Sequence, residues 1–310
     1  MSTTHAGAFP VEVTTESSAS GPGIVRLLRR HALTTFFVLA FGITWLVWVP
    51  RAATMHGLVA ADWAVVVGRG WTYIPALAAL LAAAITGGRP AVRDLGARLG
   101  RWRVGWWWYA VVLAGPCAIG VAVASVWVAL GGAWADAAPP ALTSGPGGGP
   151  LPVPLLALFF VLLALTDGLG EEPGWRGYAL PRLLAGHGAL AASLLLGVVW
   201  AAWHLPLFWT AGAPLEGRSI LLQFLALPAL SILYTWVYRH TQGSLLLAVL
   251  FHAASNLWGL AALPPAGADV TPALLRIGAT WLVALGVVAG EWSAWQTHRP
   301  AAPAPARVAV

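Results

Sequence analysis

Residues 151–170, LPVPLLALFFVLLALTDGLG, decide the fold class of this chain. Asp167 is the only charged residue in this stretch of 20 residues. An α-helix rises 1.5 Å per residue, so a helix of this length is about 30 Å long, which matches the hydrocarbon core of a bilayer. The stretch therefore predicts a transmembrane helix.

Apolar stretches of similar length recur through the rest of the chain. Of its 310 residues, 59% are hydrophobic and 9% are charged, which lies outside the usual composition of soluble domains. The sequence therefore predicts an all-α, polytopic membrane protein with about eight transmembrane helices. The predicted spans are residues 33–50, 63–86, 106–130, 151–170, 188–209, 219–238, 244–263 and 272–290.

One membrane domain, residues 26–292, is predicted between two polar tails. Residues 1–25 are rich in Ser, Thr and Gly, and residues 293–310 are rich in Ala and Pro; both compositions are typical of disordered segments. The polar tail before the first span argues against a cleaved signal peptide. We therefore expect this span to stay in the mature protein. Both tails are expected to be cytoplasmic, as the arginines indicate.

All 17 basic residues are arginine, and their distribution predicts the orientation in the membrane. With the amino terminus inside, 13 of the 17 lie on the cytoplasmic side, as the positive-inside rule requires. The four on the other side are Arg51, Arg69, Arg218 and Arg276. We therefore expect a multi-pass protein of a bacterial plasma membrane with both termini cytoplasmic. The net charge of +6 then indicates anionic lipid at the cytoplasmic face rather than a nucleic-acid partner.

Ionisable and amide side chains inside the predicted spans or directly beside the fourth span are the candidate functional residues. An ionisable side chain at the centre of a bilayer costs about 2.5–3.5 kcal/mol on insertion scales, so its presence indicates a function. A single histidine on an apolar helix would more often be a packing residue, but here several polar residues occur on nearby spans. They are Asp167, Glu171, Glu172, Arg176, His204, His252 and Asn256.

The two adjacent glutamates are predicted to have different surroundings. In a helix, Glu172 and Arg176 are four residues apart and can form an ion pair, whereas Glu171 points about 100° away and stays free. Pro173 lacks a backbone N–H and fits best in the first turn of a helix. We therefore expect a helix break near residues 168–170 and a new helix that starts at Glu171.

The other candidates also share helix faces. His252 and Asn256 are four residues apart on one predicted span, and Trp200 and His204 have the same spacing on another. Pro206 removes a backbone donor two residues after His204, so a carbonyl group near this histidine loses its helical partner. At 1.5 Å per residue, the glutamates and both histidines lie at depths within about 12 Å of one another. The three spans can therefore share one intramembrane site.

Three short motifs on these spans resemble those of a known family. EEPGWR (residues 171–176), WAAWH (residues 200–204) and HAASN (residues 252–256) occur in this order. They resemble the motifs of the CPBP family of intramembrane proteases, which includes the type II CAAX prenyl endopeptidases and bacterial proteins called Abi or bacteriocin-immunity proteins. The resemblance places the protease motifs within residues 168–256. It implies eight transmembrane helices and a site that opens toward the cytosolic leaflet.

The resemblance also implies roles for individual residues. Glu171 would be the general base that activates water, and His204 would help to hold that water. His252 and Asn256 would stabilise the oxyanion that forms on the attacked carbonyl group. These roles suit the chemistry, because hydrolysis of an amide needs both a base and directed hydrogen-bond donors.

Two further motif residues would support this site, and one position departs from the family pattern. Glu172 and Arg176 would be supporting residues of the first motif. The second motif usually begins with phenylalanine, whereas this chain has Trp200. This departure leaves the histidine intact and affects the expected shape of the pocket.

Two cofactor states are consistent with the predicted site, none or zinc. Glu171, His204 and His252 together could bind zinc in a site with two histidines and one glutamate, with water as the fourth ligand. The sequence has no H-E-x-x-H motif, and its one cysteine, Cys117, excludes a cysteine cluster. We therefore favour the metal-free glutamate mechanism.

The leading hypothesis is an intramembrane endopeptidase whose partner is a membrane-anchored peptide or protein substrate. In a bacterial host, prenylated proteins are scarce, so a different membrane peptide is expected. A second hypothesis is a non-catalytic scaffold or bacteriocin-immunity protein, which the burial cost of so many polar residues disfavours. A third is an ion-coupled transporter, but the buried ionisable residues occur only in the second half of the chain, and no inverted repeat is evident.

Overall fold

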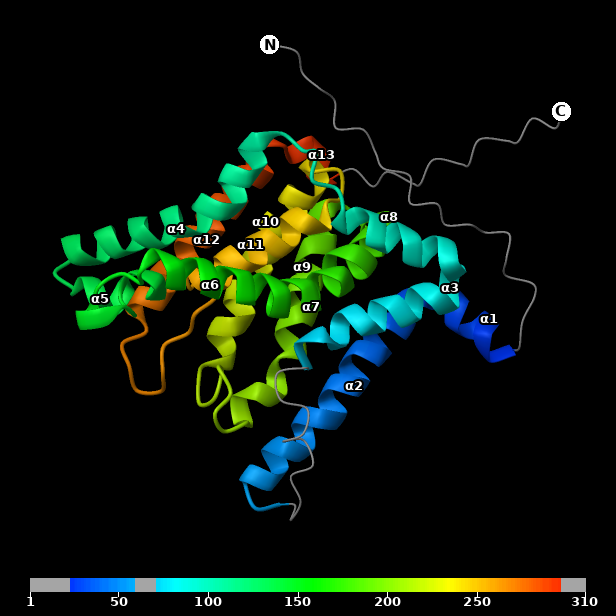
Figure 1. The fold of residues 1–310 in the computed structure, drawn as a ribbon, viewed down its shortest axis with the longest axis horizontal. Helices are drawn as coiled ribbons and strands as arrows, with labels where there is room; N and C mark the ends of the chain where they lie inside the picture. Colours follow the sequence, from blue (N-terminus) through cyan, green and yellow to red (C-terminus); the bar gives the residue numbers. More distant parts are fainter. Residues whose placement is uncertain (1–22, 59–70, 297–310) are drawn as a thin grey trace, which may run out of the picture.

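The computed structural model describes residues 23–58 and 71–296, and the regular structure in these ranges is entirely helical (Figure 1). This confirms the predicted all-α class. The predicted tails fall almost wholly on residues 1–22 and 297–310, which lie outside the described chain. At the edges of these tails, residues 23–25 and 293–296 are helical.

The described residues form α-helices, π-helical segments and 3₁₀ segments. The α-helices are α1 (Gly23–Arg30), α2 (Ala32–Met55), α3 (Ile74–Leu99), α4 (Trp106–Ala129), α5 (Trp134–Ala137), α6 (Val153–Leu163), α7 (Leu169–Glu172), α8 (Leu180–Gly186), α9 (Ala189–Trp203), α10 (Ile220–His240), α11 (Leu245–Leu257), α12 (Thr271–Gly290) and α13 (Trp292–Gln296). The π-helical segments are η5 (Ala164–Gly168) and η6 (Pro173–Ala179). The 3₁₀ segments are η3 (Pro140–Leu142), η4 (Pro146–Gly148) and η7 (Leu205–Trp209).

Within the described ranges, 7 helical units are long and apolar enough to cross a membrane. They are Ala32–Met55, Trp71–Leu99, Trp106–Ala129, Val153–Gly186, Ala189–Trp209, Ile220–His240 and Thr271–Gly290. The predicted seventh span, residues 244–263, contains only the 13-residue helix α11, which is about 20 Å long at 1.5 Å per residue. α11 is therefore shorter than a bilayer core, and it packs inside the bundle, where most of its residues are buried. The polytopic class is thus confirmed, with seven long units and one short helix.

The fourth span does not break at residues 168–170 as predicted. Val153–Gly186 is one helical unit, in which η5, α7, η6 and α8 follow α6 directly. Gly168 and Pro173 both keep helical backbone angles, with φ of −61° and −59°. A π-helix pairs each N–H with the carbonyl group five residues earlier, and this wider turn accommodates Pro173 without a break in the helix.

Two glycines bring this span close to the start of α3. A Cβ atom at Gly174 would lie 2.7 Å from the carbonyl oxygen of Pro75, and one at Gly170 would lie even closer to the carbonyl oxygen of Thr72. No side chain fits at either glycine without a shift of the backbone. The span that carries both glutamates is therefore fixed against α3.

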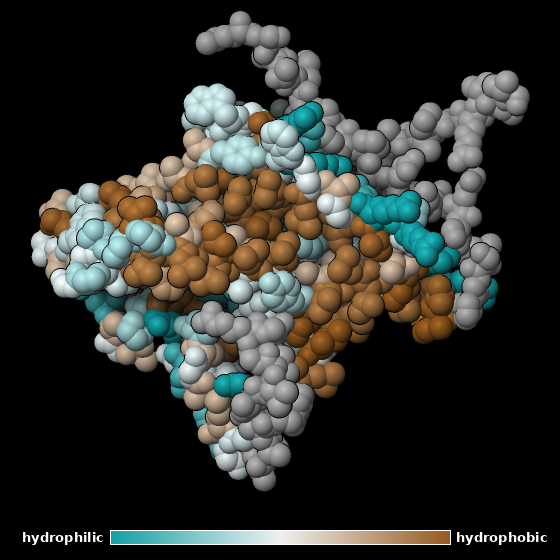
Figure 2. Space-filling view, in the orientation of Figure 1, coloured by the Kyte–Doolittle hydropathy of each residue, from teal (hydrophilic) through white to brown (hydrophobic). Residues whose placement is uncertain are grey.

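The two ends of the bundle differ in charge. One end, here called the arginine-rich end, consists of α1, the second half of α3, α8, the end of α10, and α13; the opposite, loop end consists of the end of α2, η7 and residues 210–219 and 258–270 (Figure 1). On the face shown in Figure 2, the surface between the two ends is largely apolar, and hydrophilic residues gather along the arginine-rich end. The described arginines at the arginine-rich end are Arg26, Arg29, Arg30, Arg89, Arg93, Arg98, Arg101, Arg103, Arg182 and Arg239.

Candidate active site

The ion pair predicted from the sequence is present and fully buried. Arg176 Nη1 donates a hydrogen bond of 2.9 Å to Glu172 Oε1, and both side chains have 0% exposure. The same oxygen lies 2.7 Å from Nδ1 of His252 on α11. Glu172 therefore connects the fourth span to α11, a contact between helices that spacing along one helix could not predict.

Two aromatic rings flank the guanidinium group of Arg176. Its Cζ atom lies 4.5 Å from the ring centre of Trp200 and 3.8 Å from that of Tyr234. Both contacts are cation–π interactions, which stabilise a charge that is removed from water. Arg176 and Glu172 thus form a fixed charged pair behind the site.

Glu171 is not free, contrary to the prediction. Its Oε2 accepts hydrogen bonds from Nε1 of Trp175 at 3.1 Å and from Nε1 of Trp200 at 2.7 Å. Trp175 lies four residues after Glu171, the same spacing that pairs Glu172 with Arg176. Trp200, in contrast, lies on another helix, α9. Across residues 23–58 and 71–296, no hydrogen bond engages the second oxygen, Oε1. The two indoles therefore fix the carboxylate and leave one oxygen without a protein partner.

Trp200 is consequently part of the site, although the sequence related it only to the shape of the pocket. A phenylalanine at this position would have no ring N–H to donate to Glu171. Trp200 donates a hydrogen bond to Glu171. Its ring also packs against Arg176, the partner of Glu172. An indole at a motif position near an intramembrane carboxylate is a signal that could have identified it.

The side chains of His204 and Asn256 each form one hydrogen bond with another group of the described chain. Nδ1 of His204 lies 2.8 Å from the carbonyl oxygen of Trp200. α9 ends one residue before His204, and a 3₁₀ turn follows. Nδ2 of Asn256 donates a hydrogen bond of 3.0 Å to Oδ2 of Asp167.

A cavity of about 560 Å³ joins these side chains. Its polar lining around the glutamate consists of Asp167, Glu171, Trp200, His204, Tyr234, His252, Ser255 and Asn256. The remainder comes from the end of α2, the residues just before α3, Leu207, the first half of α10, and the segments 210–218 and 259–263. Glu172 and Arg176 lie outside the lining. The resemblance gave roles to six residues. Four of them, Glu171, His204, His252 and Asn256, line the cavity, and the other two, Glu172 and Arg176, lie behind it.

The direction of the cavity brings two predictions into conflict. The cavity extends from Glu171 to the loop end of the bundle, because residues 210–218 and 259–263 line it there. The resemblance implies an opening toward the cytosolic leaflet, whereas the arginine distribution implies that the loop end lies outside. These two predictions cannot both hold.

The zinc alternative required Glu171, His204 and His252 as ligands. In the part of the chain that the structure describes, no group of three or more His, Cys, Asp or Glu side chains is arranged to hold a metal ion. The remaining ligand atoms of the three residues would be Oε1 of Glu171 and Nε2 of each histidine, since Nδ1 of both histidines is engaged elsewhere, as is common for histidine ligands. As they lie, the three side chains do not form a tetrahedral zinc site.

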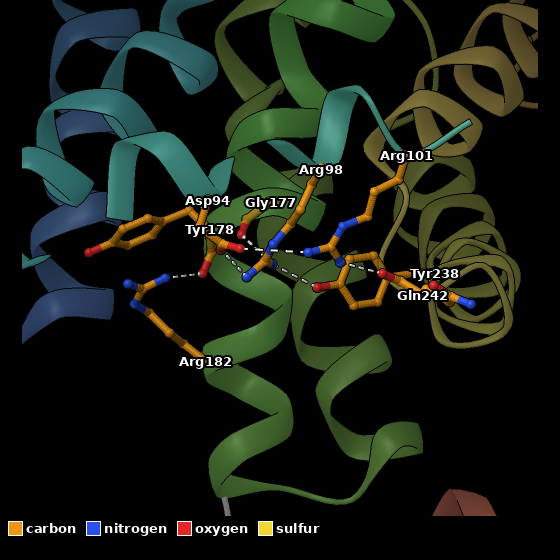
Figure 3. Close-up of polar contacts among 8 residues, drawn as sticks. All are labelled: Asp94, Arg98, Arg101, Gly177, Tyr178, Arg182, Tyr238 and Gln242. Carbon is orange, nitrogen blue, oxygen red and sulfur yellow. Dashed lines mark hydrogen bonds and ion pairs between the residues drawn. The ribbon is translucent and has the colours of Figure 1, made fainter. Parts of the chain in front are cut away.

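A second polar cluster fastens the π-helical segment from the arginine-rich end (Figure 3). Arg98 Nη1 donates hydrogen bonds to Tyr238 Oη at 2.9 Å and to the carbonyl oxygen of Gly177 at 3.4 Å. Arg98 also forms an ion pair with Asp94 one turn earlier on α3. Because Gly177 follows Arg176 in η6, α3 and α10 together hold the segment that carries the buried ion pair.

Two comparisons with known proteins identify the part of the chain that carries the three motifs. A family model described as type II CAAX prenyl endopeptidase Rce1-like matches residues 153–258. Over 106 residues, the chain is 37% identical to CAAX prenyl protease 2 of Methanococcus maripaludis, and this match spans 32% of the chain and 38% of the relative's own length. The matched segment contains all the predicted site residues. Residues 153–258 are therefore similar to the type II CAAX prenyl endopeptidases, which the sequence resemblance to the CPBP family had implied.

Proposed function

We propose that this protein is an intramembrane endopeptidase that hydrolyses a peptide bond in a membrane-anchored peptide or protein. The observation that carries the proposal is the carboxylate of Glu171. Two indoles hold one of its oxygens, and no hydrogen bond from residues 23–58 or 71–296 engages the other, in a cavity shared with two histidines and an asparagine. The similarity of residues 153–258 to type II CAAX prenyl endopeptidases supports the same class of reaction.

Glu171 is assigned as the general base. Attack of water on an amide carbonyl group requires a group that accepts a proton from the water. Oε1 has no hydrogen-bond partner within the described chain, and so it can accept that proton. His204 has one ring nitrogen fixed on a backbone carbonyl group, which leaves Nε2 to hold the same water. A base whose other oxygen is fixed keeps the orientation that the reaction requires.

His252 and Asn256 are assigned as donors to the oxyanion. The carboxylate of Glu172 lies against Nδ1 of His252, an arrangement that stabilises an imidazolium, in the manner of the aspartate in a Ser-His-Asp triad. The imidazolium then donates from Nε2 to the oxyanion. Asn256 gives one amide hydrogen to Asp167 and has a second for the substrate. Loss of one such donor typically costs about 2.7–4 kcal/mol of transition-state stabilisation.

The substrate proposed is a membrane-anchored chain, because the cavity lies within a bundle whose outer surface is largely apolar (Figure 2). A soluble peptide would have to leave water to reach Glu171, whereas an anchored one is already concentrated at the membrane. The protein named CAAX prenyl protease 2 supports a lipid-anchored substrate by analogy. Anionic lipid at the arginine-rich end is proposed as a second partner, since this end holds most of the described arginines.

The test is cleavage of a library of membrane-anchored reporter peptides by purified full-length protein in liposomes, with products identified by mass. The proposal predicts cleavage by the wild type and by Glu216→Gln, a surface control, and none by Glu171→Gln. Equal cleavage by Glu171→Gln would overturn the assignment of the base. Loss of activity with a chelator and its recovery with zinc would replace the metal-free mechanism with a zinc mechanism.

A further inference from the structure

We propose that the substrate chain lies in extended form along one face of α10, where Gln223 binds its backbone about five residues from the bond that is cleaved. This face, here called the α10 face, consists of Gln223, Leu227, Leu230 and Tyr234. None of these residues belongs to the three motifs. The subsite rests on the proposed function, because it concerns how the same cavity holds its substrate.

The sequence places these four side chains on one side of α10. Their positions follow one another at intervals of four, three and four residues, which is the repeat of a single face of an α-helix. All four line the cavity, and none is more than 4% exposed. The α10 face is therefore one wall of the cavity.

One end of this wall lies beside the groups assigned to catalysis. The ring centre of Tyr234 is 5.8 Å from that of Trp200 and 6.2 Å from that of His252. Trp200 in turn donates its indole hydrogen bond to Glu171. The other end of the wall is Gln223, in the first turn of α10. The 11 positions between the two ends correspond to about 16 Å along the helix, which is the length of about five residues of an extended chain.

Gln223 is the residue that points to a peptide ligand. Its side chain is buried, and its Oε1 atom forms no hydrogen bond with residues 23–58 or 71–296. Buried polar atoms in proteins nearly always have a hydrogen-bond partner, so this exception requires an explanation. A side-chain amide can accept a hydrogen bond from the backbone N–H of one substrate residue and donate one to the carbonyl oxygen of that residue.

An extended substrate segment needs such a partner. Each of its residues has a backbone donor and a backbone acceptor, and inside a bundle in a membrane an unpaired group of this kind is costly. Leu227 and Leu230 cannot pair with the backbone, so they contact a substrate side chain instead. They lie four and seven positions from Tyr234, which places an apolar substrate side chain about two to three residues from the cleaved bond.

The contact is tested by Gln223→Met in the full-length protein in liposomes. Methionine keeps the unbranched shape of glutamine but has no amide. The loss of one hydrogen bond to the substrate should raise KM by about 2- to 12-fold, and kcat should not change, because the contact is the same in the bound substrate and in the transition state. Stability should not fall, because the lost oxygen has no partner in the described chain. Leu225→Met, at an exposed position of the same helix, is the control and should change neither KM nor stability.

A set of reporters locates the contact along the substrate. Each reporter replaces one amide other than the cleaved one with an ester, which removes a backbone N–H and keeps the carbonyl oxygen. With the wild type, the ester about five residues from the cleaved bond should raise KM, and with Gln223→Met that ester should have no further effect. The same response of both proteins to every ester would overturn the proposal. A lower stability of Gln223→Met with a wild-type KM would also overturn it, because Gln223 would then be a packing residue.

Binding measurements separate the subsite from the reaction. The affinity of one anchored reporter is compared for Glu171→Gln and for the double variant Glu171→Gln/Gln223→Met, neither of which is expected to cleave it. The double variant should bind about 2- to 12-fold more weakly. Equal affinity, with cleavage by the wild type, would overturn the subsite and leave the proposed protease. Weaker binding by the double variant, without cleavage of any reporter by the wild type, would support the subsite and count against the proposed function.

Discussion

Trp200→Phe tests whether the indole of Trp200 positions the catalytic base. The substitution keeps an aromatic ring in the bundle but removes Nε1, which donates the 2.7 Å hydrogen bond to Glu171 Oε2. The carboxylate then keeps only the 3.1 Å hydrogen bond from Trp175. Because one bond fixes a carboxylate less well than two, Oε1 would no longer be held in its reactive orientation.

The size of the effect follows from the hydrogen bond that is lost. A hydrogen bond to a charged group contributes about 1.5–3 kcal/mol, and each 1.36 kcal/mol of activation free energy corresponds to a factor of ten in rate. Trp200→Phe should therefore lower kcat by about 10- to 150-fold. KM should change little, because the indole contacts the base and is assigned no binding contact of its own.

The assay is steady-state cleavage of a membrane-anchored reporter in liposomes, and Trp203→Phe is the matched control. Trp203 lies on the same helix, is also buried, and donates its indole hydrogen bond of 3.0 Å to Thr44 rather than to Glu171. Both variants lose a buried indole donor, and both should lose some stability. Wild-type kcat in Trp200→Phe, or an equal loss of kcat in Trp203→Phe, would refute the positioning role.

Three other substitutions have defined outcomes. Glu172→Gln leaves a buried guanidinium without its charged partner, so it should lower the free energy of unfolding by about 3–5 kcal/mol. This is measured by unfolding in detergent, where the exposed control Glu216→Gln should change the free energy little. Gly174→Ala places a methyl group 2.7 Å from a backbone oxygen of α3 and should cost about 1–3 kcal/mol; Gly186→Ala, which meets nothing within 4 Å, should not. Asn256→Ala should lower kcat by about 10²–10³, and an unchanged kcat would remove it from the oxyanion site.

The sequence was sufficient for the fold class and for contacts within one helix. Long apolar stretches have few structural solutions in a bilayer, so the spans could be predicted from length and composition. The pair formed by Glu172 and Arg176 followed from a spacing of four residues. The length of α11 could not be predicted, because its apolar pattern continues into residues 258–263, which form turns at the loop end.

Contacts between helices limited the prediction of the site. Gly170 and Gly174 bring the fourth span close to the start of α3, and the local sequence does not encode which backbone these glycines meet. The hydrogen bond from Trp200 to Glu171 likewise joins residues 29 positions apart. Trp175, in contrast, lies four residues after Glu171 and could have been found by the spacing that identified the ion pair.

The central claim, that Glu171 activates water, is tested most directly by the kinetics of Glu171→Gln. Glutamine keeps the size of the side chain and an oxygen that can accept both indole hydrogen bonds, but it has no basic oxygen. Cleavage and binding of one reporter are measured for the wild type, Glu171→Gln and Glu216→Gln in liposomes. The account predicts that Glu171→Gln binds the reporter with wild-type affinity and that its kcat falls by about 10²–10⁴. A kcat within about threefold of the wild type, a change of under 1 kcal/mol, would contradict it.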